Sequence, residues 1–134
     1  LGESGITFFA TAAQADELSA RFPQGLDGHP MLMPSSGSNL RRDLQNWFER
    51  HGISPRIVAE FEDRALMKAF GEGGGGVFTS PTAVEQDVLQ KYGVSVIGRT
   101  DEITERFFAI SAERRIKHPA VSAITEAARN KLFV

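Results

Sequence analysis

The chain has 134 residues, which is enough for one domain, or a piece of one, with a buried core. Its 15 Lys and Arg residues against 17 Asp and Glu argue against nucleic-acid binding by this segment alone, because such binding needs clustered positive charge. The absence of cysteine excludes disulfides, zinc–thiolate sites and a cysteine nucleophile, and it fits a reducing compartment. No apolar run approaches the roughly 20 residues of a membrane span, and no signal peptide opens the chain. We therefore expect a cytoplasmic protein with no membrane partner.

Strand and helix patterns alternate along the whole chain. Short apolar runs predict strands at residues 6–10, 30–33, 56–61, 77–79, 94–97 and 106–110, with a polar segment at 99–105 between the last two. Apolar residues at helical spacing predict helices at residues 15–22, 39–51, 63–70 and 84–92, and from residue 119 onward. Strands that alternate with helices of about ten residues predict an α/β fold with a largely parallel sheet.

The clearest predicted helix follows Asn39, which is a plausible cap. Its apolar residues recur at i, i+4, i+7 and i+8 from Leu40, and Gly52 supplies a stop signal. A shorter predicted helix at residues 63–70 has as its apolar residues Leu66, Met67 and Phe70.

The glycine run GEGGGGVFTSP at residues 71–81 satisfies G-x-G-x-x-G at Gly71, Gly73 and Gly76. In dinucleotide-binding folds those glycines follow a strand and open a helix. Here the predicted helix comes before the glycines and the strand comes after them, and a helix carboxy terminus carries partial negative charge that repels phosphate. No Gly-Lys-Ser/Thr follows, as a P-loop would require. We therefore predict that the run ends a helix.

Two predicted strand-to-helix junctions carry hydroxyl groups. The first contains Ser35, Ser36, Gly37 and Ser38, and the second contains Thr79 and Ser80. Ligands of open α/β sheets bind outside the carboxyl ends of strands, where helix amino termini present free N–H groups. The two junctions can therefore line one ligand-binding cleft. The alternative is that both are polar loops before capped helices.

A third predicted junction is acidic. Glu60, Glu62 and Asp63 bracket Phe61, and hard cations such as sodium or calcium prefer carboxylate and carbonyl oxygens. These three acids are the candidates for a metal site. The favoured interpretation is that they complement the dipole of the following helix.

Groups that would indicate catalysis are not found together. His29, His51 and His118 are widely separated and form no ligand-spaced pair. His51 is expected to be partly buried or to cap the helix before it. No G-x-S-x-G nucleophile elbow occurs. We predict no catalytic residue and no enzymatic activity.

Several segments together resemble the effector-binding domain of LysR-type transcriptional regulators. In that family a short helix ends in glycines and runs into an apolar strand closed by proline, as residues 60–81 do. The family's helix after the effector loop is similar to residues 36–48. Residues 106–111 and 117–121 resemble a family member that activates sodium/proton antiporter genes.

The resemblance implies a fold like the periplasmic binding proteins of type 2, with two lobes and the effector between them. It assigns residues 1–97 to lobe two and residues 98–134 to the return strand and helix of lobe one. A winged helix–turn–helix, which would bind DNA, and the first part of lobe one would precede Leu1. By the same resemblance, the residues carried over to the effector loop or near the cleft are Ser36, Gly37, Ser38, Phe61 and Thr79.

The function that follows is a ligand-sensing regulatory domain of a LysR-type activator, without a cofactor and with a small molecule or a sodium ion as effector. The full-length protein would be a homo-oligomer that contacts DNA only through the missing domain. One alternative is a solute-binding protein of a transport system, which shares the two-lobed architecture. A second alternative, a small α/β enzyme acting on a phosphorylated substrate at the serine loop, lacks an acid and base that can be placed together.

Overall fold

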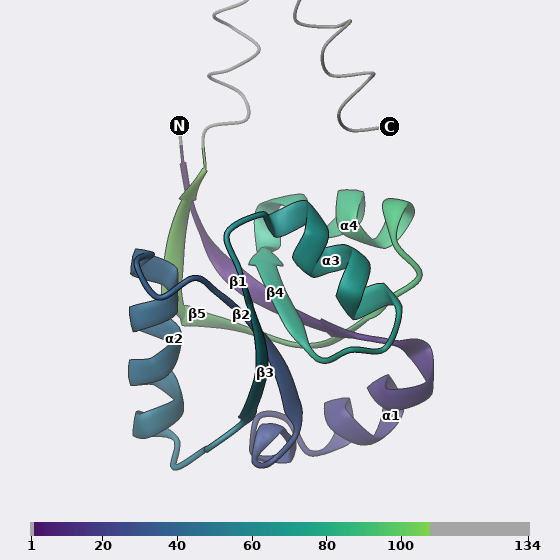
Figure 1. Cartoon of the computed structure of the whole chain (residues 1–134), viewed down its shortest axis with the longest axis horizontal. Coiled ribbons are helices and arrows are strands. Elements are labelled where there is room, and N and C mark those ends of the chain that lie inside the picture. The colour runs from purple at the N-terminus through teal and green to yellow at the C-terminus, as the bar shows by residue number, and fades with distance from the viewer. Residues whose placement is uncertain (1, 108–134) are drawn as a thin grey trace, which may run out of the picture. The chain divides into compact units, whose positions relative to one another are not determined.

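The computed structural model describes residues 2–107 (Figure 1). The chain divides into a compact unit, Ser4–Glu105, and a second unit made of Leu1–Glu3 and Arg106–Val134. The helices and strands in chain order are β1 (Gly2–Ala10), α1 (Ala12–Ala20), the short 3-10 helix η1 (Gln24–Leu26), β2 (Pro30–Pro34), α2 (Asn39–Arg50), β3 (Arg56–Phe61), α3 (Arg64–Glu72), β4 (Phe78–Pro81), the 3-10 helix η2 (Thr82–Val84), α4 (Glu85–Lys91) and β5 (Ser95–Phe107). The helix predicted from residue 119 lies outside the described residues, as does His118.

The strands form two hydrogen-bonded sets that meet at Val77. One set has the order β4–β1–β5, and the other pairs β2 with β3 in parallel. A parallel bridge joins Met31 of β2 to Val77, just before β4, with the Val77 N–H donating to the Pro30 carbonyl at 3.0 Å. The carboxyl ends of β2, β3 and β4 therefore lie at one edge of the sheet.

The expectation of a largely parallel sheet is wrong for β1. This strand runs antiparallel to β4, with Ile6 opposite Pro81 and Phe9 opposite Phe78. The apolar pattern of a buried strand is the same in either direction, so periodicity alone does not fix strand direction. Because β1 is antiparallel to β4, it ends at the edge where β2, β3 and β4 begin.

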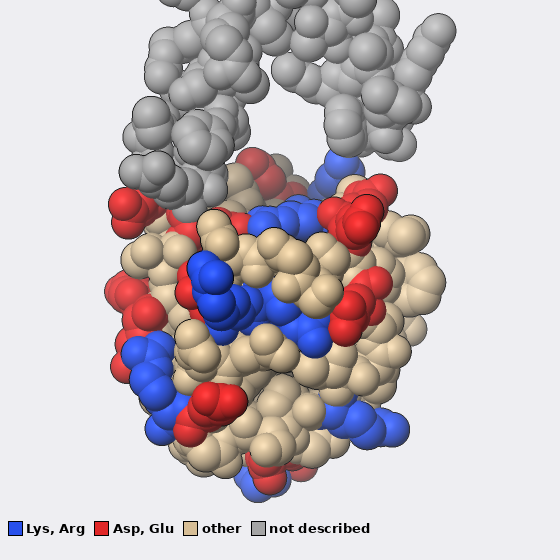
Figure 2. All heavy atoms as spheres, turned by 60° about the vertical axis from the view of Figure 1, so that its left-hand side comes forward, with Lys and Arg blue, Asp and Glu red and all other residues tan. Residues whose placement is uncertain are grey.

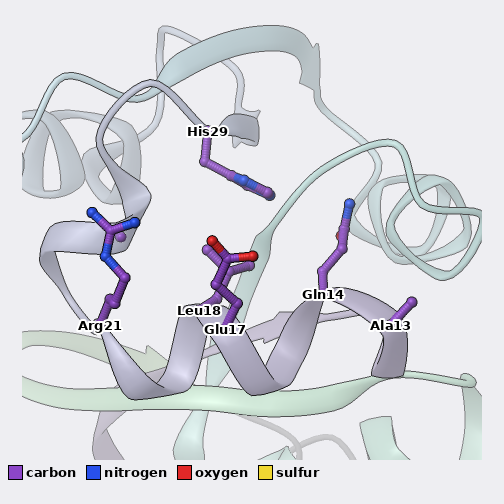
Figure 3. A pocket seen from close by; sticks show the side chains of 7 residues that line it. Ala13, Gln14, Glu17, Leu18, Arg21 and His29 are labelled. Atoms are coloured by element: carbon purple, nitrogen blue, oxygen red, sulfur yellow. The ribbon is translucent and has the colours of Figure 1, made fainter.

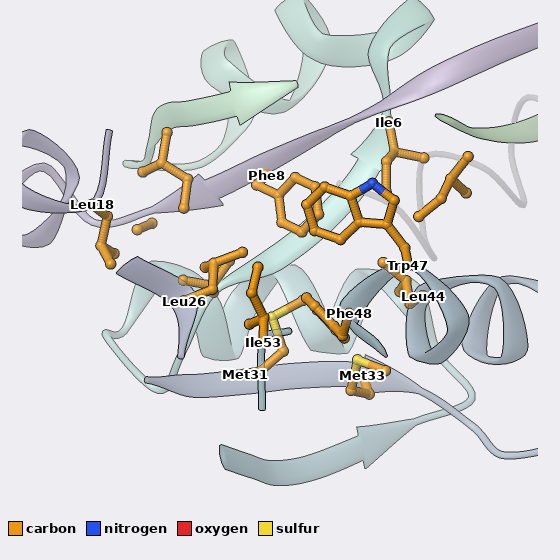
Figure 4. Packing of buried hydrophobic residues seen from close by; sticks show 14 of the residues in the cluster. Ile6, Phe8, Leu18, Leu26, Met31, Met33, Leu44, Trp47, Phe48 and Ile53 are labelled. Carbon is orange, nitrogen blue, oxygen red and sulfur yellow. The ribbon is translucent and has the colours of Figure 1, made fainter. Parts of the chain in front are cut away.

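One core fills the space between the sheet and the helices α1 and α2 (Figure 4). Trp47 of α2 lies at its centre, with its ring 5.3 Å from the ring of Phe8 on β1. The predicted spacing of α2 is confirmed, since the residues at i, i+4, i+7 and i+8 are all buried: Leu40, Leu44, Trp47 and Phe48.

A second core lies on the other face of the sheet, under α3 and α4. Successive residues of a strand point to opposite faces, so Phe8 enters the first core while Phe9 enters the second. Phe9 stacks on Phe78 of β4 with ring centroids 5.2 Å apart, and Met67 of α3 packs in the same cluster. The unit is thus a sheet between two layers of helices, as Figure 1 shows.

The glycine run ends a helix, as predicted. α3 extends through Gly71 to Glu72, and Gly74 then adopts a left-handed conformation with φ of 90°. Gly71 is required for a different reason, because a Cβ there would lie 2.2 Å from the ring of Phe78. The prediction for the apolar face of this helix is only partly right: Met67 is buried, whereas Leu66 and Phe70 are 49% and 51% exposed.

The polar segment at residues 99–105 does not separate two strands. β5 is one continuous strand of 13 residues. Its polar side chains find partners on neighbouring helices: Arg99 pairs with Glu85 of α4, and Glu102 accepts a hydrogen bond from Trp47 of α2. Ile103, the residue after Glu102, is buried. The expectation of two strands failed because these pairings are not visible in a local pattern.

Candidate functional site

The serine junction after β2 is tied to the end of β3. The Ser35 N–H donates to the Phe61 carbonyl at 2.9 Å, and the Ser38 hydroxyl donates to the Ser35 carbonyl at 3.0 Å. Ser38 also caps α2, since its Oγ accepts from the Arg41 N–H at 3.1 Å. The cap predicted at Asn39 is therefore one residue too late. Ser36 and Gly37 are exposed at the tip of the junction.

The hydroxyls of the second junction are enclosed and unsatisfied. Thr79 and Ser80 are buried in β4, and neither side-chain oxygen has a hydrogen-bond partner in the described part of the chain. An unpaired buried hydroxyl costs about 1–3 kcal/mol, so such groups are few in native proteins. The structure thus brings both hydroxyl-bearing junctions and Phe61 to the same edge, as expected from the parallel strands.

Arg41 is a residue of this edge that the sequence did not reveal. Its side chain is buried, and its Nη1 donates to the Pro34 carbonyl at 3.0 Å and lies 3.1 Å from Oε2 of Glu60. It therefore links the ends of β2 and β3 beneath the serine junction. A cation in the first turn of a helix opposes the helix dipole. The position of Arg41 in the first turn of α2 is therefore the feature of the sequence from which an acidic partner could have been predicted.

The acids at the third junction have structural partners. Glu60 pairs with Arg41, and Oδ1 of Asp63 accepts from the Ala65 and Leu66 N–H groups, so that Asp63 caps α3. Glu62 is exposed. No cluster of three or more His, Asp or Glu residues able to hold a metal occurs within residues 2–107. The role of Asp63 agrees with the interpretation that these acids serve the helix amino terminus.

A buried polar network lies next to this edge, around Thr7, which pairs with Ser80 across β1 and β4. The Thr7 hydroxyl donates to Oε1 of Glu85 at 2.8 Å, and Arg99 of β5 donates to both oxygens of Glu85 at 2.7 Å. The hydrogen bond from Arg99 is the main cause that lowers the pKa of the Glu85 carboxyl. In the sequence, the only indication of this network is Thr7, a single threonine within an apolar strand.

Positive groups crowd along α3. Arg64 forms an ion pair with Glu105 at the end of the compact unit. Burial lowers the pKa of Lys68, and repulsion from Arg64 and Lys91 lowers it further. On the face shown in Figure 2, Lys and Arg side chains gather near the middle with Asp and Glu around them. The charges on this face are therefore mixed, in line with the nearly balanced composition.

His51 caps α2 and is partly buried, as expected. Its ring packs on Trp47 with centroids 4.5 Å apart, and Nε2 lies 2.8 Å from Oε1 of Glu102. Trp47 donates to the same oxygen at 2.7 Å. Hydrogen bonds from His51 first, and then Trp47, lower the pKa of Glu102. The cluster fastens α2 to β5.

Comparison with known proteins identifies relatives of the chain. The family model described as LysR substrate binding domain matches residues 7–132. The transcriptional activator protein NhaR of Escherichia coli (strain K12) is 38% identical over 133 residues, which is 99% of this chain and 43% of NhaR. NhaR of Shigella flexneri gives the same values. The chain thus spans less than half the length of these relatives.

Solved structures show the same fold. The regulatory domain of CcmR from Synechocystis PCC6803, in complex with 2-PG, superposes with a TM-score of 0.62 at 17% identity, over 92% of this chain and 64% of that one. A periplasmic binding protein of an ABC transporter from Brucella ovis, with glutathione bound, gives 0.57 at 14% identity, over 78% and 35%. The predicted α/β fold of the periplasmic-binding-protein type is therefore confirmed. In the described part of the chain, no helix has the length and hydropathy to span a membrane.

Proposed function

We propose a function from the premise that this chain belongs to the LysR substrate binding domain family: it is the ligand-sensing regulatory domain of a LysR-type transcriptional activator. The observation that carries the proposal is the similarity to NhaR along nearly the whole chain. NhaR is an activator of sodium/proton antiporter genes, and residues 106–111 and 117–121 resemble it. More specifically, we propose that the regulator controls sodium/proton antiporter genes in response to sodium.

The effector, a small molecule or a sodium ion, would bind at the carboxyl-end edge of the sheet. The proposed contacts are Ser35, Ser36, Gly37, Ser38, Phe61, Thr79 and Ser80. Two features support this place: the exposed tip of the serine junction, and the unsatisfied hydroxyls of Thr79 and Ser80. Because those two hydroxyls are enclosed, an effector would reach them only after neighbouring side chains move. Binding would then favour one arrangement of the regulator over another, which is a population shift.

The remaining assignments follow from the family. Residues 1–97 would form lobe two and residues 98–134 the return of lobe one, although the compact unit continues to Glu105 and β5 crosses the proposed boundary. DNA would be bound by a separate domain of a cytoplasmic homo-oligomer, and the effector would be sensed without enzymatic turnover.

A domain exchange tests the regulatory function. The 134-residue chain replaces the matching segment of Escherichia coli NhaR, and expression from a sodium/proton antiporter promoter is measured with NaCl or with equal choline chloride. We expect activation that rises with NaCl. NhaR lacking the segment is the control. A stable exchange protein that activates no better than this control would contradict the proposal.

Direct sodium sensing is tested separately by thermal unfolding of the full-length protein. Anything that binds only the folded state raises its melting temperature. We expect a higher melting temperature in NaCl than in equal choline chloride. Identical unfolding curves would count against direct sodium binding and leave a small molecule as the effector.

A solute-binding protein of a transport system is the second candidate, since the Brucella ovis protein shares the fold. The two functions need different segments before Leu1. A coding sequence upstream for a winged helix–turn–helix supports the regulator, whereas a cleavable export signal there supports the transport protein.

A further inference from the structure

A hollow in the unit lies away from the proposed effector edge. It has a volume of about 160 Å³ and is bordered by α1, η1 and the residue before β2 (Figure 3). α1 follows the carboxyl end of β1, and His29 directly precedes β2. Both positions are at the edge where β2, β3 and β4 begin. The hollow is therefore at the opposite end of the sheet from the serine junction.

Two enclosed polar atoms at this hollow have no partner. Oε1 of Gln14 and Nε2 of His29 are both buried and make no hydrogen bond among the described residues. Figure 3 shows the imidazole of His29 pointing into the space above α1, with the side chain of Gln14 rising from the helix beside it. Burial lowers the pKa of His29, which favours the neutral ring, and Nε2 of that ring donates or accepts according to its tautomer. Both atoms thus lack a partner, and a ligand in the hollow would reach them after a small movement of the side chains that enclose them.

The two charged residues of the hollow are exposed and are not paired with each other. Glu17 and Arg21 are one helical turn apart, a spacing at which opposite charges on a helix normally attract each other. Both line the hollow, yet within residues 2–107 neither side chain forms an ion pair. A negative group and a positive group therefore border the same small space, together with two unsatisfied polar atoms.

We propose that this hollow binds a small zwitterion, a molecule with an ammonium and a carboxylate group a few bonds apart, such as a small α-amino acid. The Glu17 carboxylate and the Gln14 carbonyl oxygen receive the ammonium group. The Arg21 guanidinium binds the carboxylate, and His29 supplies the remaining hydrogen bond. The volume is well below the roughly 300 Å³ at which drug-sized sites begin, which favours a ligand as small as glycine or serine.

This inference does not depend on the proposed regulatory function, and its test uses the 134-residue chain alone. The chain is labelled with ¹⁵N and titrated with glycine, while amide and side-chain signals are followed by NMR. We expect saturable shifts at Gln14, Glu17 and His29, with the serine junction unaffected. Methylammonium and acetate each supply half of the ligand, and we expect each to bind at least tenfold more weakly than glycine.

Three variants complete the test. Glu17→Gln and Arg21→Gln should each weaken glycine binding about tenfold or more, since each replaces a charged partner of the ligand with a neutral amide, and hydrogen bonds between charged groups are the stronger ones. Glu49→Gln, the same change at an exposed position of α2, should have no effect. The proposal is overturned if glycine gives no saturable shift, if shifts appear only at the serine junction, or if the three variants bind alike. Methylammonium binding as tight as glycine, with Arg21→Gln unchanged, would replace the zwitterion with a simple cation.

Discussion

At the scale of single residues, the polar groups inside the unit are more informative than its apolar core. Glu85 is buried beside Thr7 and is held by two hydrogen bonds from Arg99. A buried carboxylate is tolerated only when it is paired and hydrogen-bonded. These contacts connect β1, α4 and β5 through one side chain, so Glu85 stabilises the arrangement of three elements.

Glu85→Gln should reduce the stability of the chain at neutral pH and make that stability less sensitive to a fall in pH. The pKa of Glu85 is lowered from its ordinary value of 4.5 in the folded chain. A carboxyl with a lowered folded pKa adds stability that is present above its unfolded pKa and is lost as the pH falls through the folded pKa. At pH 7 we expect the free energy of unfolding of the variant to be about 1–3 kcal/mol lower than that of the wild type. When the pH is lowered below about 4.5, we expect the free energy of unfolding to fall less for the variant than for the wild type. Urea unfolding at both pH values measures this, with exposed Glu49→Gln as the control. Parallel pH profiles for Glu85→Gln and the wild type would refute the role of Glu85.

At the scale of elements, the contact between α3 and β4 shows how a glycine can be fixed by packing. Gly71 lies inside α3, where alanine is intrinsically better by about 1 kcal/mol. A Cβ at Gly71 would nevertheless lie 2.2 Å from the ring of Phe78, which is fully buried. The close approach of helix and strand therefore outweighs helix propensity.

Gly71→Ala should destabilise the chain by about 1–3 kcal/mol, the usual cost of overpacking a core. Gly37→Ala is the matched control, because Gly37 has open space around its Cβ position. We expect the control to change stability by less than about 0.5 kcal/mol, as for other surface substitutions. Thermal unfolding compares the two variants. Equal melting temperatures would mean that α3 can shift away from β4 at little cost.

The same elements show what could be predicted from sequence. α2 was predicted because its apolar spacing and its stop signal are local properties, and the end of α3 was predicted because glycine is expected there. The continuity of β5 was missed because Arg99 and Glu102 are satisfied by partners on α4 and α2, far away in sequence. Strand direction and the buried Arg41 were missed for the same reason. Local periodicity finds helices and strands, whereas pairings between distant segments become visible only in the folded chain.

At the scale of the whole molecule, β3 forms one border of the sheet. Among the described residues its only strand partner is β2, so its other edge has free backbone N–H and C=O groups. Ile57 and Val58 on this strand are 39% and 46% exposed. Natural proteins normally cover or charge such an edge, because it otherwise pairs with another chain. An exposed apolar edge strand thus supports the proposal that the protein is a homo-oligomer.

Val58→Lys should weaken self-association of the chain, since a charged side chain on an edge strand opposes pairing with a second copy. Its effect on the fold should be small because Val58 is half-exposed. Analytical ultracentrifugation over a range of concentrations should show an association constant at least tenfold lower than that of the wild type. Gln90→Lys, an exposed position on α4, is the matched control and should associate like the wild type. If Val58→Lys associates as strongly as this control, the β3 edge is not where two copies meet, and the covered surface must be sought elsewhere on the chain.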